Sequence, residues 1–177
     1  MSNFDYALQK VLINEGGYVN DSSDSGKETY KGISRRWHSG WDGWSIIDNH
    51  KKLPNFPNNL DSNTDLQTRI RMFYLLNFWT PINGDNITDK DISYSIFDFA
   101  VNCSPMVSII LSQKIIGVTI DGIPGNQTIS KINEFNIESF KEKFTLQKIM
   151  YYICCVKKNL ADEKFFFNWV CRSINGI

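Results

Sequence analysis

Glu15 is the carboxylic residue whose place in the sequence most clearly indicates chemistry. An apolar stripe at helical spacing precedes it, and Gly16 and Gly17 follow it, so we expect a helix that ends at Glu15. The carboxyl end of a helix carries partial negative charge, which disfavours an ionised carboxylate, and partial burial acts in the same direction. We therefore expect Glu15 to keep a proton near neutral pH, as a general acid for a glycosidic oxygen must.

A glycosidase usually places a second carboxylate across the bond it cuts. Asp21 and Asp24 lie in the polar segment after Glu15, and the hydroxyl of Thr29 can hold a water molecule. Asp21 is better explained as a turn residue bonded to its own backbone, whereas Asp24 suits either role equally. The candidate catalytic residues are therefore Glu15, Asp24 and Thr29.

Aromatic and amide side chains suited to sugars are dense between residues 18 and 44. We expect Tyr18, Tyr30 and Trp37 to bind substrate, although tryptophans here can equally pack the interior. Asp98 lies on the apolar stripe of a predicted helix, with Asn102 one turn on. Each of these two either caps a loop or lines the cleft opposite Glu15, and Arg172 is a candidate partner for one of them.

The elements that must position these residues are mainly helices. After the first helix, residues 18–62 look irregular, with short strand candidates at 30–33 and 45–47. Further helices are predicted at about 66–78, 90–102, 105–116, 127–132, 137–159 and 161–174. The sequence thus predicts a mainly α fold of the α+β kind, a helical bundle with a small irregular or β-containing N-terminal lobe.

Composition and charge exclude several other classes. The 177 residues include 19 basic and 19 acidic ones, so the basic excess typical of nucleic-acid binding is missing. The N-terminus does not resemble a signal peptide, and the longest apolar stretches are too short to cross a bilayer. The four cysteines show no metal-ligand spacing, and we expect them to be buried, reduced thiols of a protein folded in the cytoplasm. No cofactor is expected.

The segment EGGYVNDSSDSGKETYKGIS, residues 15–34, resembles the signature of glycoside hydrolase family 108, the peptidoglycan muramidases common as phage endolysins. The matching residues are Glu15, Gly16, Gly17, Tyr18, Val19, Asn20, Asp21, Asp24, Gly26, Thr29, Gly32 and Ile33. The family usually has proline and glycine where this chain has Ser25 and Lys27, and asparagine in place of Tyr30. The resemblance implies that Glu15 is the essential acid, with Asp24 and Thr29 in supporting roles.

The C-terminal half resembles the helical peptidoglycan-binding module that accompanies this family. FDFAVN at 97–102, GVTIDGIPGNQT at 117–128 and NWVCR at 168–172 carry the likeness, with Ser104 and Asn168 where glycines are usual. We therefore expect a muramidase region at 1–86 and a peptidoglycan-binding region at 87–177, divided within the polar segment 83–89.

The resemblance implies a lysozyme-like α+β fold and hydrolysis of the β-1,4 bond between N-acetylmuramic acid and N-acetylglucosamine. The expected partner is the peptidoglycan strand, with no nucleic acid, no membrane insertion and a monomeric chain. We expect synthesis in the cytoplasm and action on the cell wall, in the periplasm or outside, after holin-type or specialised export. The alternatives are a lytic transglycosylase using the same glutamate, a non-catalytic wall-binding protein, a thiol or metal peptidase, and a helical interaction protein.

Overall fold

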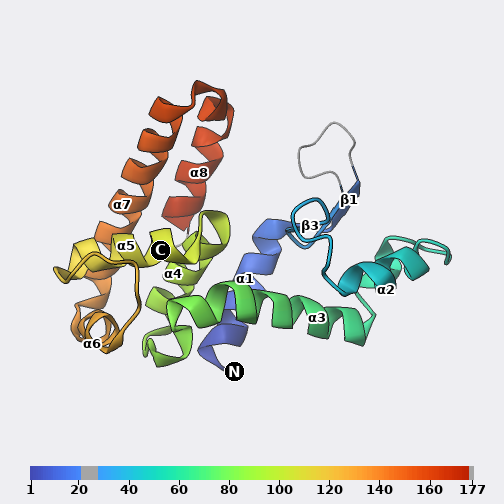
Figure 1. Cartoon of the computed structure of the whole chain (residues 1–177), viewed down its shortest axis with the longest axis horizontal. Coiled ribbons are helices and arrows are strands. Elements are labelled where there is room, and N and C mark those ends of the chain that lie inside the picture. Colours follow the sequence, from blue (N-terminus) through green and yellow to red (C-terminus); the bar gives the residue numbers. More distant parts are fainter. Residues whose placement is uncertain (21–27, 176–177) are drawn as a thin grey trace. The chain divides into compact units, whose positions relative to one another are not determined.

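The chain forms two compact units (Figure 1). The computed structural model describes residues 1–20 and 28–175, apart from the side chain of Asn175. One unit spans Leu8–Leu75, and the other joins Met1–Ala7 to the chain from Leu76 onward. The boundary between the two units thus lies several residues before the predicted boundary segment 83–89. Our division into a muramidase and a binding region stays a prediction.

The unit formed by Leu8–Leu75 combines helices with a small sheet. Its three strands are antiparallel and lie side by side in sequence order. The elements are the later part of α1 (Asn3–Glu15), β1 (Tyr18–Asn20), β2 (Glu28–Tyr30), β3 (Ile33–Ser34), α2 (Gly43–His50), a 3₁₀ turn (Asn58–Leu60) and α3 (Thr64–Tyr74). A π-helical turn, Leu75–Trp79, continues α3.

The small sheet predicted in this unit is present, but neither strand candidate is placed correctly. The candidate at 30–33 covers the end of β2, the two-residue turn and the start of β3, because Lys31 and Gly32 have positive φ and reverse the chain. The candidate at 45–47 lies inside helix α2. The physical reason is that Trp44 and Ile47 are both buried, and residues three apart share one face of a helix but not of a strand.

The other unit is helical, and its helices begin where capping residues predict. Asp89 accepts from the backbone N–H of Ile92 at 2.8 Å, and Ser104 accepts from that of Val107 at 3.2 Å. The helices are α4 (Lys90–Asn102), α5 (Pro105–Ile116), α6 (Asn126–Glu134), α7 (Ile137–Lys158) and α8 (Glu163–Asn175), with 3₁₀ turns at Thr80–Ile82, Gly84–Asn86 and Leu160–Asp162. The predicted helices at 90–102 and 105–116 are thus confirmed.

Helix α4 is the centre of this unit. Its residues from Ile92 to Ala100 are all buried, so both apolar and polar faces of the helix are covered. The ring of Phe97 packs edge-on against Trp79, with centroids 5.4 Å apart, and Phe99 packs edge-on against Phe144 at 5.9 Å. The chain is therefore mainly helical with one small sheet, as predicted.

Two further expectations concern the cysteines and the membrane. The four cysteines are free, as predicted, but Cys154 is exposed and the others are partly exposed, so the prediction of buried thiols was wrong. Among the residues that the structure describes, no helix combines the length and the apolar character needed to span a membrane.

A buried charge cluster joins α4, α7 and α8. Arg172 donates to the carboxylate of Asp98 at 2.9 Å, which confirms the partner predicted for that residue. Lys148 is only 2% exposed, and its ammonium donates to the carbonyl of Ser173 at 3.2 Å. Burial lowers the pKa of Lys148 to about 8; the charge of Asp98 opposes this effect and that of Arg172 adds to it.

Replacing Lys148 with methionine should remove a pH-dependent cost of folding. Between pH 8 and the ordinary lysine value of 10.5, the unfolded chain binds more protons than the folded one, so the free energy of unfolding rises with pH. The charged lysine costs about 3 kcal/mol at pH 7. Lys148→Met should therefore gain stability over the wild type at pH 7, and the gain should shrink by pH 10. Urea unfolding at four pH values measures this difference. A difference in the free energy of unfolding that does not change with pH would contradict a lowered pKa of Lys148.

Candidate active site

Glu15 stands at the end of helix α1, as predicted. Gly16 follows it with φ +74°, a left-handed conformation that glycine adopts without strain and that ends a helix. The Glu15 side chain is half-buried. Helix α1 therefore presents this carboxyl at its C-terminal end, where the backbone carbonyls carry partial negative charge.

The turn between β2 and β3 lies against the Glu15 side chain. Lys31 and Gly32 occupy this two-residue turn with φ values of 47° and 75°, as a type I′ hairpin turn requires. A Cβ atom added to Gly32 would stand 2.5 Å from Glu15 Oε2 and 3.1 Å from Glu15 Cβ. Only glycine leaves room for the carboxyl here, so the turn and the helix end form one small site.

Tyr74 of helix α3 completes this arrangement. Its hydroxyl donates to the backbone carbonyl of Lys31 at 2.7 Å, and it lies 2.7 Å from the same added Cβ position on Gly32. The side chain is 1% exposed. Our sequence reasoning missed Tyr74, although Leu66, Ile70 and Tyr74 recur every four residues on a buried face. A buried tyrosine hydroxyl needs a partner.

Of the two other catalytic candidates, the structure describes Thr29 but not Asp24. Thr29 is the middle residue of β2, paired with Val19 on one side and Ser34 on the other. Side chains alternate along a strand, so Thr29 faces away from the sheet side that carries its neighbours Glu28 and Tyr30. Asp24 lies in segment 21–27, outside the described residues. The structure thus places two of the three catalytic candidates in the same unit.

Glu28 is a second carboxylate of the sheet, and sequence reasoning missed it. It accepts from Arg35 Nη1 at 2.7 Å and forms an ion pair with Lys51 Nζ at 2.7 Å. Burial alone would raise the pKa of Glu28, but the hydrogen bonds from Lys51 and Arg35 outweigh it and lower the pKa below its ordinary value. A carboxylate held ionised by two cations serves structure and is unsuited to general acid catalysis.

The tyrosines predicted to bind sugar are bonded within the unit. The hydroxyl of Tyr18 donates to Glu28 at 3.0 Å, and its half-buried ring packs edge-on against Phe56. Tyr30 is 2% exposed, with its hydroxyl donating to Asp61 at 3.0 Å. Burial raises the pKa of Tyr30 to about 12, a shift that the Asp61 carboxylate strengthens. The Tyr30 ring is therefore part of the core.

The tryptophans of this unit divide into exposed and packed ones. Trp37 is 68% exposed, with the Arg36 guanidinium 4.9 Å from its ring centroid. Trp44 is buried and donates to the carbonyl of His38 at 2.8 Å, and Trp41 packs edge-on against it at 5.2 Å. Trp37 therefore presents the ring surface that a sugar can reach.

Asp98 and Asn102 belong to the other unit, where both are engaged internally. The Asp98 side chain is 5% exposed and accepts from Arg172, and the Asn102 amide donates to the hydroxyl of Tyr152. Asp98 has the partner that the sequence suggested, and these contacts join α4 to α8 and α7 without capping a loop.

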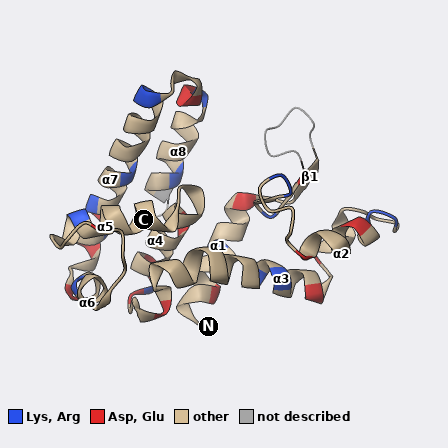
Figure 2. Ribbon diagram, viewed as in Figure 1, with Lys and Arg blue, Asp and Glu red and all other residues tan. Residues whose placement is uncertain are grey.

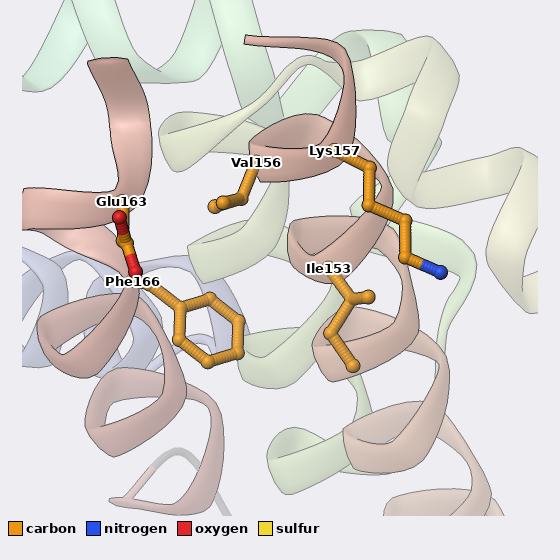
Figure 3. Close-up of a pocket in the computed structure, with 5 residues that line it drawn as sticks. All are labelled: Ile153, Val156, Lys157, Glu163 and Phe166. Carbon is orange, nitrogen blue, oxygen red and sulfur yellow. The ribbon is translucent and has the colours of Figure 1, made fainter. Parts of the chain in front are cut away.

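A pocket of about 240 Å³ lies between α7 and α8 (Figure 3). Ile153 and Val156 of α7 and Phe166 of α8 form its apolar lining, with Lys157 and Glu163 at its edges. None of these residues belongs to the predicted site.

A helical chain with a small sheet, and with a half-buried carboxyl held between a helix end and a glycine turn, has the features of a glycosidase. The sequence matches the family described as glycosyl hydrolase 108 over residues 8–103, more than half of the chain. The chain therefore belongs to glycosyl hydrolase family 108. Membership makes it a glycosyl hydrolase and implies peptidoglycan as its substrate class.

The fold resembles a solved structure described as that of Brucella abortus SagA. The two share 22% sequence identity with a TM-score of 0.70, over 98% of this chain and 90% of that chain. At this level of identity the likeness concerns the fold. Among curated proteins, none matches the chain.

Replacing Trp37 with alanine should weaken binding to cell walls while leaving the fold intact. The ring is mostly exposed, so its loss should change stability by at most about 0.5 kcal/mol. Loss of one sugar-stacking surface should raise the Kd for purified walls by about tenfold, equivalent to about 1.4 kcal/mol. Leu53→Ala, which removes another exposed apolar side chain of the same unit, is the control. Equal affinities for both variants would contradict a binding role for Trp37.

Proposed function

We propose that the chain hydrolyses the β-1,4 bond between N-acetylmuramic acid and N-acetylglucosamine in peptidoglycan, with Glu15 as the general acid. The observation that carries this proposal is the placement of the Glu15 carboxyl against the Gly32 turn. Both residues lie inside the part of the chain that matches the glycosyl hydrolase family. Glu28, held by two cations, is not an alternative acid.

The proposed reaction begins with proton transfer from the Glu15 carboxyl to the bridging oxygen. The bond between that oxygen and the anomeric carbon breaks, and the leaving sugar departs as a neutral alcohol. A water molecule adds its oxygen to the anomeric carbon, and its released proton restores the acid. In this proposal Thr29 orients the water and Asp24 stabilises the positive charge that develops on the sugar ring.

Substrate binding in this proposal relies on ring stacking and neutral hydrogen bonds more than on charge. Acidic and basic residues are mixed along the described helices (Figure 2), and the formal net charge is zero. The exposed ring of Trp37 and the accessible part of Tyr18 are the proposed contacts with the glycan. Peptidoglycan lies outside the cytoplasmic membrane, so we propose that a monomeric enzyme reaches it by holin-type or specialised export.

Glu15→Gln should abolish lysis of permeabilised cells while leaving wall binding intact. Glutamine has nearly the same shape but cannot donate the acid proton, and loss of a general acid typically lowers kcat by about 10²–10⁴-fold. Turbidity loss and co-sedimentation with purified walls measure the two properties.

Glu142→Gln is the matched control, since Glu142 is an exposed glutamate of the other unit. It should keep full activity. Normal lysis by Glu15→Gln would overturn the assignment of Glu15 as the acid. A wild-type protein that binds cell walls without cutting them would be a binding protein and not an enzyme.

The products of digestion should identify the bond and the reaction. Hydrolysis at the proposed bond leaves muramic acid at a new reducing end, which mass spectrometry detects after borohydride reduction. Anhydro-muramic acid would instead indicate a lytic transglycosylase using the same glutamate. Newly freed amino groups would indicate a peptidase and contradict the proposal.

A further inference from the structure

Three groups from distant parts of the sequence meet at the Gly32 turn. Glu15 Oε2 and the Tyr74 hydroxyl lie 2.5 and 2.7 Å from the same point, the place where a Cβ on Gly32 would stand. The Tyr74 hydroxyl is also 2.7 Å from the carbonyl oxygen of Lys31. A carboxyl, a phenol and a backbone carbonyl thus share one small space.

The bond to Lys31 decides what the Tyr74 oxygen can offer to a further neighbour. A phenol has one proton to donate, and Tyr74 directs it to the Lys31 carbonyl. The oxygen can then only accept a hydrogen bond. The phenol proton is therefore used to hold the turn.

The same bond also fixes the turn. Lys31 has φ 47°, a backbone conformation that residues other than glycine rarely adopt, so the turn needs stabilising contacts. Tyr74 is almost fully buried on α3 and ties this turn to the helix. The ion pair of Lys31 with Asp61 at 3.3 Å adds a second tie, but a more exposed one.

We propose that Tyr74 is a positioning residue for the acid, holding the Lys31–Gly32 turn against the Glu15 side chain through its hydrogen bond to the Lys31 carbonyl. Tyr74 does not touch the substrate. This inference rests on the proposed function of Glu15 and adds the residue that keeps the turn, and with it the carboxyl, in place. An unanchored carboxyl would sample several rotamers, and a displacement of about 1 Å can cost about 10²-fold in rate.

Tyr74→Phe tests this role because it removes the hydroxyl and keeps the buried ring. We expect kcat on soluble peptidoglycan fragments to fall by about 10–100-fold with KM unchanged within about twofold, since substrate contacts are preserved. Tyr6→Phe is the matched control. It removes a hydroxyl whose hydrogen bond to Asp91 is also 2.7 Å long but lies in the other unit.

A purely structural role for the Tyr74 hydroxyl would give a different result. Both phenylalanine variants would then lose similar stability in thermal unfolding, and both would keep the wild-type kcat. An unchanged kcat for Tyr74→Phe, or a parallel change in kcat and KM, overturns the proposal.

Gly32→Ala provides an independent test from the other side of the contact. The new methyl group would collide with Glu15 Oε2, and we expect kcat to fall at least as far as in Tyr74→Phe. Gly117→Ala is its control, because Gly117 has φ +72° against +75° for Gly32, but nothing lies within 4 Å of an added Cβ. The two variants share backbone strain and differ in the clash, so equal activities would contradict the proposal.

Failure of this inference is distinguishable from failure of the proposed function. A wild type that cleaves glycan and a Glu15→Gln variant that does not would establish the acid, whatever Tyr74→Phe does. A wild type that cleaves no glycan would refute the function itself.

Discussion

The close approach of a carboxyl to a backbone turn is the constraint on which the site depends. Glu15 ends a helix, and the turn that meets it has no space for a side chain at Gly32. That requirement explains why the turn is of the two-residue type with two positive φ values, and why a buried hydroxyl from α3 secures its carbonyl. Three otherwise separate elements are thereby held to one carboxyl, and a shift of any of them would move it.

The sheet separates two glutamates into two chemical roles through their surroundings. Glu28 is paired with Arg35 and Lys51, so its charge is compensated and its pKa lies below the ordinary value. Glu15 stands at the end of α1 against the Gly32 turn. The same residue type therefore anchors a strand in one place and meets a backbone turn in the other.

In this chain, sequence patterns predict local structure better than they predict contacts between residues far apart in the sequence. The caps Asp89 and Ser104 act within one helical turn, so the starts of α4 and α5 could be placed closely. The strand expected at 45–47 was wrong because so short a segment, Ser45 followed by two isoleucines, fits either period, and burial of Trp44 and Ile47 on one face favours a helix. Tyr74 was missed because its partner is a carbonyl 43 residues away, and no local spacing encodes such a pair.

The helical unit is held in part by a buried pair of charges that the sequence motifs contain. The family match ends at residue 103, yet the likeness to the Brucella abortus SagA structure covers 98% of the chain at 22% identity. Within this unit, Asp98 faces two cations, Arg172 and Lys148, in the buried space between three helices. A misplaced helix would leave one of these charges buried without a partner, at a cost of several kcal/mol. Such a cluster therefore helps to specify how α8 lies on α4 and α7.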